Sequence, residues 1–441
     1  MRTVLAIPMA GRGERMGDIS RVVPKGLINY HNHTFLYHIY QYYDGQFDEC
    51  VVTVASEFKD MLTQYAHNFG LELTIVIDDS YNGNSVILES IDADTVILNW
   101  CDVVPVDVDV RNLSDGVTVF TKSGTGRYVY DGSVVETAVD AGDFCGIYAL
   151  HNTPEYNLVW GDFVDVMQAN SFDVSLRACD VVDLGSADKL ARTQESLPTC
   201  RYFNEIEFDD DTVTKRASGE EGTFKIRQEI STLLERRVGY VELLEHDESS
   251  YTMRRVDGRI PRQINAPMIN EGDDVCVESI RREITHRILS RMRDIECYVG
   301  INSEDLVSGV KRIEEFVIEN TTKFYDIHGD LVCDNAIETI DGDIVLIDPR
   351  GFFGHSKRGP IEYDTSKFLY SVNGYYKFNY DVLYDGNHAR YDNHSDMSLL
   401  EEAWVATHWL ALAGFFKNNP AKAIGAYHIG MCKMNRVIEK L

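Results

Sequence analysis

Basic residues are scarce in this sequence. Its 441 residues include 42 lysines and arginines against 71 aspartates and glutamates, which gives a formal net charge of −29. A protein that neutralises nucleic-acid phosphates needs a basic face, and an anionic membrane surface attracts the same kind of face. We therefore expect no nucleic-acid partner and no membrane partner, although a local basic pocket for a nucleotide is compatible with this charge.

Long apolar runs and paired cysteines are also missing. No stretch approaches the roughly 18 apolar residues of a membrane-spanning helix, and the N-terminal apolar run is too short for the core of a signal peptide. The nine cysteines are scattered without a Cys-x-x-Cys pair, which favours free thiols in a reducing compartment. These absences predict a cytoplasmic protein.

The patterns that are present predict two domains in succession. Residues 1–198 alternate apolar strands with helices, which is typical of a doubly wound α/β fold with a mainly parallel sheet. The polar stretch around residues 195–199 contains a proline and is a plausible linker. Residues 199–441 begin with short strands and one helix over 224–237 and continue as helices, which predicts an α+β, bilobal arrangement.

A glycine-rich turn follows the first predicted strand. It contains Ala10, Gly11 and Gly13, where the backbone can approach a polyphosphate so that its amides point at the oxygens. Arg15 and Lys25 follow and can supply positive charge to the same anion. A lone Gly-x-Gly is often only a turn, but Gly-x-Gly-x-Arg-Met followed by Pro-Lys-x-Leu is rare by chance. The motif favours a nucleotide-phosphate site.

This motif resembles that of the sugar-phosphate nucleotidyltransferases, which include cytidylyltransferases that activate phosphocholine or sugar phosphates. The resemblance implies that Asp102, which follows an apolar strand, holds Mg²⁺, and that Asp183 in an Asp-Leu-Gly-Ser segment completes the metal site. A carboxylate at the carboxyl end of a strand lies where open α/β sheets bind ligands, and two carboxylates with phosphate oxygens suit Mg²⁺. Asn84 lies where the family contacts the base. The alternatives are a strand-end cap for Asp102 and turn positions for Asp183 and Asn84.

The chemistry that this resemblance implies is nucleotidyl transfer. A phosphomonoester oxygen would attack the α-phosphorus of an NTP, CTP or UTP, and release pyrophosphate. Mg²⁺, Arg15 and Lys25 would stabilise the charge on the phosphates. The family's usual Glu-Lys-Pro element is absent, which leaves the identity of the acceptor phosphate open.

A second motif lies in the C-terminal half. It reads His-Gly-Asp-Leu at 328–331, with Asn335 on the same loop and Asp348 at the end of an apolar strand. Asp330 can accept a proton from an attacking hydroxyl, while Asn335 and Asp348 can hold Mg²⁺ on ATP phosphates. The motif resembles the aminoglycoside phosphotransferase and choline kinase branch of the kinase-like fold.

The small lobe offers matching parts for ATP. Lys215 ends a predicted strand and could bind the α- and β-phosphates, and Glu229 on the next helix could pair with it, with Glu235 as the alternative. Asp364 is most simply a helix N-cap.

Together the two motifs predict a bifunctional enzyme. One half would phosphorylate a small alcohol (a sugar, polyol or amino alcohol) with ATP, and the other would couple the phosphoester to a nucleotide for surface-glycan or headgroup synthesis. In the alternative, only one half is catalytic and the other regulates it or recruits substrate. The sequence leaves the base, the alcohol and a homo-oligomeric state open.

Overall fold

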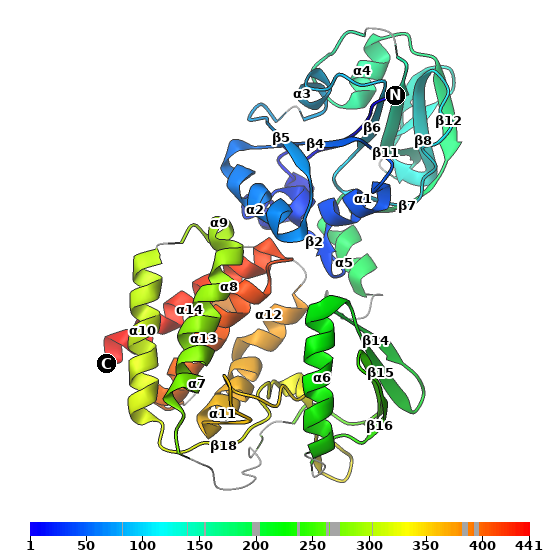
Figure 1. Cartoon of the computed structure of the whole chain (residues 1–441). Helices are drawn as coiled ribbons and strands as arrows, with labels where there is room; N and C mark the ends of the chain where they lie inside the picture. The colour runs from blue at the N-terminus through cyan, green and yellow to red at the C-terminus, as the bar shows by residue number, and fades with distance from the viewer. Residues whose placement is uncertain are drawn as a thin grey trace. The chain divides into compact units, whose positions relative to one another are not determined.

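The computed structural model describes residues 1–81, 83–138, 140–153, 156–195, 203–235, 239–261, 264, 274–301, 303–381, 387–391 and 397–441 (Figure 1). The chain divides into two compact units. The first comprises Met1–Leu197 with Asn418–Ala421, and the second Pro198–Lys417 with Lys422–Leu441. The domain boundary predicted at residue 198 lies outside the described residues. Among the described residues, no helix combines the length and hydropathy that crossing a membrane would require.

A seven-stranded sheet forms the centre of the first unit, in the order β12-β8-β11-β6-β1-β4-β5. Its strands are β1 (Thr3–Pro8), β4 (Glu49–Val54), β5 (Leu73–Ile77), β6 (Thr95–Asn99), β8 (Gly116–Gly126), β11 (Gly142–His151) and β12 (Val174–Ala178). Only β11 runs antiparallel to its neighbours in this sheet. The prediction of a mainly parallel sheet is therefore confirmed.

Burial explains why these strands form. Residues 4–7 of β1 are fully buried, and such a continuous apolar run is typical of a strand covered on both faces. The helices of this unit are α1 (Phe35–Tyr43), α2 (Lys59–Phe69), α3 (Gly83–Glu89), α4 (Phe163–Ala169) and α5 (Ala187–Glu195). Short strands outside the main sheet are β2 (Asn29–Tyr30), β3 (His33–Thr34), β7 (Val103–Asp107), β9 (Tyr128–Tyr130), β10 (Val134–Glu136) and β13 (Asp180–Asp183).

The second unit begins with a small antiparallel sheet in the order β14-β15-β17-β16. Its strands are β14 (Asn204–Phe208), β15 (Thr212–Ala217), β16 (Leu243–His246) and β17 (Ser250–Arg254), and α6 (Gly219–Glu235) accompanies them. Ile226, Ile230 and Leu233 of α6 belong to one buried cluster with Val213 and Met253 of the sheet. The helix is therefore held to the sheet by its apolar face.

The rest of the second unit is mainly helical. Its helices are α7 (Val277–Arg281), α8 (Arg287–Met292), α9 (Glu296–Val299), α10 (Ser303–Asn320), α11 (Ile361–Tyr370), α12 (Tyr376–Tyr380), α13 (Leu399–Phe415) and α14 (Pro420–Lys440). Short strands are β18 (Tyr325–Asp326) paired with β21 (Arg358–Gly359), and the hairpin β19 (Ala336–Glu338) and β20 (Ile344–Leu346). Trp404 and Trp409 of α13 are at most 1% exposed, so α13 lies in the core.

Candidate active sites

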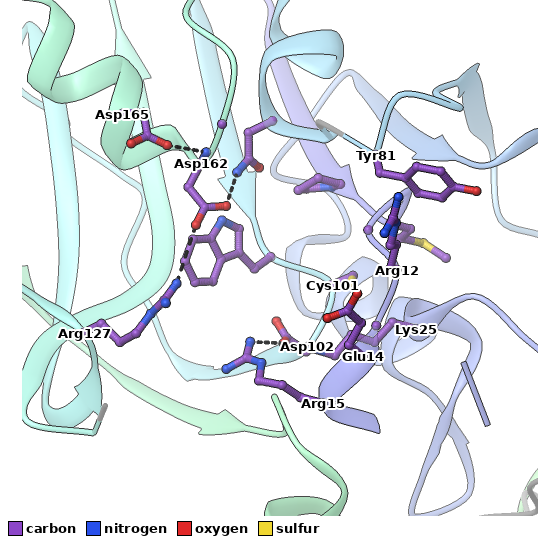
Figure 2. Close-up of a pocket in the computed structure, with 17 residues that line it drawn as sticks. Arg12, Glu14, Arg15, Lys25, Tyr81, Cys101, Asp102, Arg127, Asp162 and Asp165 are labelled. Atoms are coloured by element: carbon purple, nitrogen blue, oxygen red, sulfur yellow. Dashed lines mark hydrogen bonds and ion pairs between the residues drawn. The ribbon is translucent and has the colours of Figure 1, made fainter. Parts of the chain in front are cut away.

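A cavity of about 680 Å³ lies at the carboxyl ends of β1 and β6 in the first unit (Figure 2). Its lining comes from the glycine-rich loop after β1, the residues that follow β6, and the segments around residues 25, 81, 84, 127 and 162. The carboxyl ends of parallel strands are where open α/β sheets bind ligands. The cavity therefore has the position expected for a substrate site.

The glycine-rich loop presents free backbone amides. Among the described residues, no acceptor receives a hydrogen bond from the N–H groups of residues 10–13, whereas Met9 N still donates to Thr53 O at 3.0 Å. Gly13 has a φ of 64°, and a Cβ there would lie 2.8 Å from Ser20 Cβ, so only glycine fits without strain. Unpaired amides on a turn are suited to bind an anion.

Asp102 is the centre of charge in this cavity. It is 5% exposed and accepts a hydrogen bond from Lys25 Nζ, which also lies 3.3 Å from Gly185 O. Arg15 Nη2 is 3.8 Å from Asp102 Oδ2. Burial alone would raise the pKa of Asp102, but Lys25 and Arg15 outweigh that effect and the pKa is lowered. Asp102 is therefore held as a carboxylate.

Asp183 is brought close to Asp102 by the turn after β13. A Cβ at Gly185 would lie 2.9 Å from Asp183 Oδ1 and 3.2 Å from Asp102 Oδ2, so both carboxylates border the same small space. Asp183 also accepts hydrogen bonds from Gly185 N at 2.8 Å and Lys189 Nζ at 2.6 Å. No group of three or more metal-type side chains is found in the described part of the chain. The pair fits Mg²⁺ if substrate phosphates and water complete the coordination.

Polar residues that the sequence did not single out also border the same cavity. Asp162, at the start of α4, lies 3.4 Å from Asn84 Nδ2 and 3.7 Å from Arg127 Nη2. Arg127, Asp162 and Asp165 occupy one side of the view in Figure 2 and Tyr81 with Arg12 the other, with Asp102 and Arg15 between them. The Arg12 guanidinium carbon is 5.0 Å from the centre of the Tyr81 ring. Asn84, which the sequence predicts as a site residue, therefore lines the cavity and has Asp162 as a hydrogen-bond partner.

In the second unit, Lys215 of β15 lies at the centre of a buried charge cluster. Its Nζ is 2.9 Å from Glu229 Oε2 and 3.2 Å from Asp348 Oδ2. Burial alone would lower the pKa of Lys215, but the two carboxylates outweigh it and the pKa is raised. Glu235, the alternative partner, pairs with Lys357 instead. Lys215 is therefore held as a cation by Glu229 and Asp348.

Tyr251 of β17 joins this cluster and was not anticipated. Its hydroxyl is 2.9 Å from Glu229 Oε2 and 3.0 Å from Asp348 Oδ1. The alternation of β17 indicates only that Tyr251 faces inward, which is an ordinary signal for a core residue. Its link to Asp348 depends on a contact between segments 97 residues apart.

The loop that carries Asp330 is fixed by short hydrogen bonds. Asn335 Nδ2 donates to Asp330 O at 2.8 Å, and Ile347 N donates to Asn335 O at 3.0 Å. Asn335, just before β19, and Asp348, just after β20, therefore lie at the same end of this hairpin. His328 Nε2 contacts Ile347 O at 2.9 Å, and His328 Nδ1 accepts from Asp330 N at 3.2 Å. These contacts give His328 a structural role in the loop.

Lys367 of α11 contacts the carboxylate of Asp330 directly. The distance from Lys367 Nζ to Asp330 Oδ1 is 2.8 Å. Burial lowers the pKa of Lys367, and Asp330 only partly offsets this. The side chain of Asp330 is 39% exposed, so its carboxylate can be reached from solvent.

The prediction that Asp364 caps a helix is wrong. Helix α11 begins at Ile361 with Pro360 as its N-cap residue, so Asp364 lies inside the first turns and is 3% exposed. Its carboxylate instead accepts hydrogen bonds from His328 N at 2.6 Å and Gly329 N at 2.9 Å. An aspartate near the start of a helix is expected both at the N-cap and within the first turns, so the sequence does not distinguish the two positions. The contacts of Asp364 with His328 and Gly329 do.

We expect Asp364→Ala to destabilise the protein markedly. The change leaves two buried N–H groups without their acceptor, which costs about 2–4 kcal/mol and lowers the midpoint of thermal unfolding by roughly 5–10 °C. Circular dichroism of the full chain measures this. Asp343→Ala, at an exposed turn position, is the matched control and should shift the midpoint by no more than about 1–2 °C. Equal shifts for the two variants would contradict the role given to Asp364.

Comparison with known proteins gives matches among solved structures alone. No protein-family model matches the chain, and no curated protein matches it. The CTP:phosphocholine cytidylyltransferase of Streptococcus pneumoniae is 16% identical, with a TM-score of 0.37, and the match covers 45% of this chain and 100% of that one. An inositol-1-phosphate CTP transferase from T. maritima is 11% identical, with a TM-score of 0.35 and coverage of 45% and 98%.

A UDP-glucose pyrophosphorylase complexed with UDP-glucose is 10% identical, with a TM-score of 0.36 and coverage of 44% and 98%. These matches to nucleotidyltransferase structures lie in the N-terminal part of the chain.

Proposed function

We propose that the chain is a bifunctional transferase, with a nucleotidyltransferase site in the first unit and a small-molecule kinase site in the second. The observation that carries the proposal is the pairing of carboxylates with buried lysines in each unit. Asp102 contacts Lys25 and lies near Asp183, and Asp348 contacts Lys215. Both arrangements suit a nucleotide that arrives with Mg²⁺.

In the first unit, residues 10–13 would bind the phosphates of an NTP through their free amides. Lys25 and Arg15 would add positive charge as an oxygen of a phosphomonoester attacks the α-phosphorus and pyrophosphate leaves. Asp102 and Asp183 would hold Mg²⁺, which when bound supplies further positive charge to the phosphate oxygens. Asp102 is prepared for this because it is already a carboxylate next to two cations.

In the second unit, Asp330 would accept the proton of an alcohol as its oxygen attacks the γ-phosphorus of ATP and ADP leaves. Lys215, positioned by Glu229, would bind the α- and β-phosphates. Asn335 and Asp348 would hold Mg²⁺, which when bound neutralises charge on the ATP phosphates. Lys367 supports the role of Asp330 because its Nζ, 2.8 Å from Asp330 Oδ1, orients that carboxylate.

The two reactions form a sequence. The kinase site would make a phosphoester, and the nucleotidyltransferase site would convert it into an activated donor for surface-glycan or headgroup synthesis. The alternative, in which one unit regulates the other or recruits its substrate, predicts one activity instead of two.

A substrate panel tests the proposal. The full chain is incubated with ATP and each of several sugars, polyols and amino alcohols, then with each NTP, and the nucleotide products are read by mass spectrometry. We expect one alcohol to yield both its phosphoester and a nucleotide-linked product. A nucleotide-linked product that forms only from a supplied phosphoester would favour the one-activity alternative. No product from any combination would count against both.

A further inference from the structure

Cationic side chains line the cavity of the first unit on different sides of Asp102. Lys25 donates a hydrogen bond to Asp102, and Arg15 lies 3.8 Å from it. Figure 2 shows Arg12 on one side of Asp102 and Arg127 on the other. Arg12 belongs to the glycine-rich loop, where the triphosphate is proposed to bind. Arg127 is therefore a cation in the cavity that the proposed function does not yet use.

The guanidinium group of Arg127 is available to a ligand. Its side chain is 42% exposed, and its Nη2 is 3.7 Å from Asp162 Oδ2, which is beyond hydrogen-bond distance. In the ranges that the structure describes, no residue accepts a hydrogen bond from this guanidinium. An exposed ion pair of this kind contributes little stability, so the N–H donors of Arg127 can turn to an incoming anion.

The backbone that carries Arg127 is held on two sides. Arg127 lies between β8 and β9, and its carbonyl oxygen accepts hydrogen bonds from Thr137 N at 2.5 Å and Thr137 Oγ1 at 2.9 Å. On the other side, a Cβ at Gly142 of β11 would lie 2.4 Å from Tyr128 N and 2.8 Å from the carbonyl carbon of Arg127. The side chain therefore extends into the cavity from a fixed point.

The proposed reaction needs a cation on each side of the α-phosphate. An oxygen of the phosphomonoester forms a bond to the α-phosphorus, and the bond from that phosphorus to the bridging oxygen breaks, so its electron pair leaves with pyrophosphate. The attacking and leaving oxygens lie roughly in line, and both groups are anions. A phosphomonoester is mostly a dianion above pH 7, so its attacking oxygen needs a positive charge and no general base.

Arg127 lies near enough to Asp102 to serve this reaction. Burial raises the pKa of Asp162, and Arg127 opposes that effect. The charges of Arg15 and Asp102 also act on the pKa of Asp162, and such effects between accessible charges fade over about 10 Å at moderate salt. The pair of Arg127 and Asp162 is therefore close to the carboxylate that is proposed to hold Mg²⁺.

We propose that Arg127 binds the phosphate of the phosphomonoester and holds its attacking oxygen in line with the pyrophosphate that leaves toward Arg12. This assignment rests on the proposed nucleotidyl transfer and adds the residue that binds its second substrate. The planar guanidinium can contact two oxygens of one phosphate at once. It thereby gives the attacking group both a charge and an orientation.

Steady-state assays of pyrophosphate release by the full chain, with MgCl₂ and CTP or UTP, test the proposal. The probes are glucose 1-phosphate, glycerol 3-phosphate and phosphoethanolamine, one for each class of acceptor in the proposed function. For each probe that reacts, we expect Arg127→Gln to raise KM for the phosphomonoester by at least about tenfold, the usual effect of losing a charged hydrogen-bond donor. KM for the NTP should be unchanged. Arg127→Lys keeps the charge without the two-point contact and should give an intermediate KM.

Arg111→Gln is the matched control, because Arg111 is also exposed and close to an aspartate, with its Nε 2.8 Å from Asp109 Oδ1. It should keep both KM values. Pyrophosphate release with an unchanged acceptor KM in Arg127→Gln would overturn the assignment and leave nucleotidyl transfer intact, and so would a rise in KM for the NTP alone. No pyrophosphate release from the unaltered chain with any probe would count against nucleotidyl transfer and against the assignment that rests on it.

The same assay on Asp162→Asn separates phosphate binding from a structural pairing. If Arg127 only positioned Asp162, the loss of either partner would raise the acceptor KM alike. If Arg127 binds the phosphate, the loss of the neighbouring negative charge should leave the acceptor KM unchanged or lower it. Asparagine is as good an N-cap as aspartate, so α4 should remain intact. A rise in KM equal to that of Arg127→Gln would overturn the proposal.

Discussion

Asp330→Asn is expected to slow phosphorylation of the alcohol by about 10²- to 10⁴-fold, the usual contribution of a positioned general base. Pyrophosphate release from a supplied phosphoester and NTP should be unchanged, because Asp330 belongs to the second unit. Coupled assays for ADP and for pyrophosphate on the same preparation measure both rates. The amide keeps the size of the side chain and one acceptor for Lys367.

The control for this variant is Asp343→Asn, an exposed position on the turn between β19 and β20, which should retain both rates. Thermal unfolding separates a chemical effect from a structural one, since Lys367 loses its charged partner. A variant that phosphorylates at the normal rate would show that Asp330 is not the base. If a folded Asp330→Asn chain lost both activities equally, the two-site model would fail.

Asp102→Asn is expected to slow nucleotidyl transfer and to leave phosphorylation of the alcohol unchanged. The rate of pyrophosphate release should fall by about 10²-fold or more, because the substitution removes the carboxylate proposed to hold Mg²⁺ at the phosphates. ADP formation should continue. Asparagine is preferred to alanine here. Removing the side chain would leave Lys25 buried without its partner, which would cost about 3–5 kcal/mol of stability and confuse the result.

Asp107→Asn is the control for that variant, since Asp107 is an exposed residue at the end of β7 and should leave the rate of pyrophosphate release unchanged. The same pyrophosphate assay at several MgCl₂ concentrations adds a second measurement. If Asp102 is a metal ligand, more Mg²⁺ should partly restore the variant. A loss of rate that no Mg²⁺ concentration changes, or a normal rate, would contradict that role.

Strands with continuous apolar runs could be predicted well from the sequence. The apolar runs at 3–8 and 95–99 predict strands that coincide with β1 and β6, because each run is bounded by polar or turn residues. The helix predicted to begin at 224 begins five residues earlier, at Gly219, as α6. Glycines at 219 and 222 suggest a turn, but a Cβ at Gly222 would lie 2.1 Å from Phe203 O, so that glycine is there for close packing.

The sequence also predicts a strand over 240–245, and the structure differs from this prediction for another reason. Tyr240 forms a bridge with Leu346 of β20, and the strand proper, β16, begins only at Leu243. The local sequence favours extended backbone throughout this stretch and contains no sign of which partner each part will pair with. That choice depends on tertiary contacts with a hairpin about one hundred residues later.

The residues of the candidate sites also fall into two groups, those that the sequence predicts and those that only the structure reveals. Residues inside compact motifs, such as Lys25 and Asp330, could be named because spacing along the chain fixes their chemistry. Asp162, Arg127 and Tyr251 could not, because each enters its site from a segment whose local pattern is that of an ordinary helix start, turn or core strand. Their roles depend on distances between segments far apart in sequence.

The hydrogen bonds from His328 and Gly329 to Asp364 also bear on the motions of the second unit. Both donors belong to the loop that carries Asp330, and the acceptor belongs to the buried face of α11. The loop therefore cannot open by a small local fluctuation while α11 stays in place. In hydrogen–deuterium exchange, these two amides should exchange as slowly as the central amides of α11, as one cooperative unit. The loop would then remain rigid on the timescale of turnover, and substrate entry would depend on movements elsewhere in the second unit.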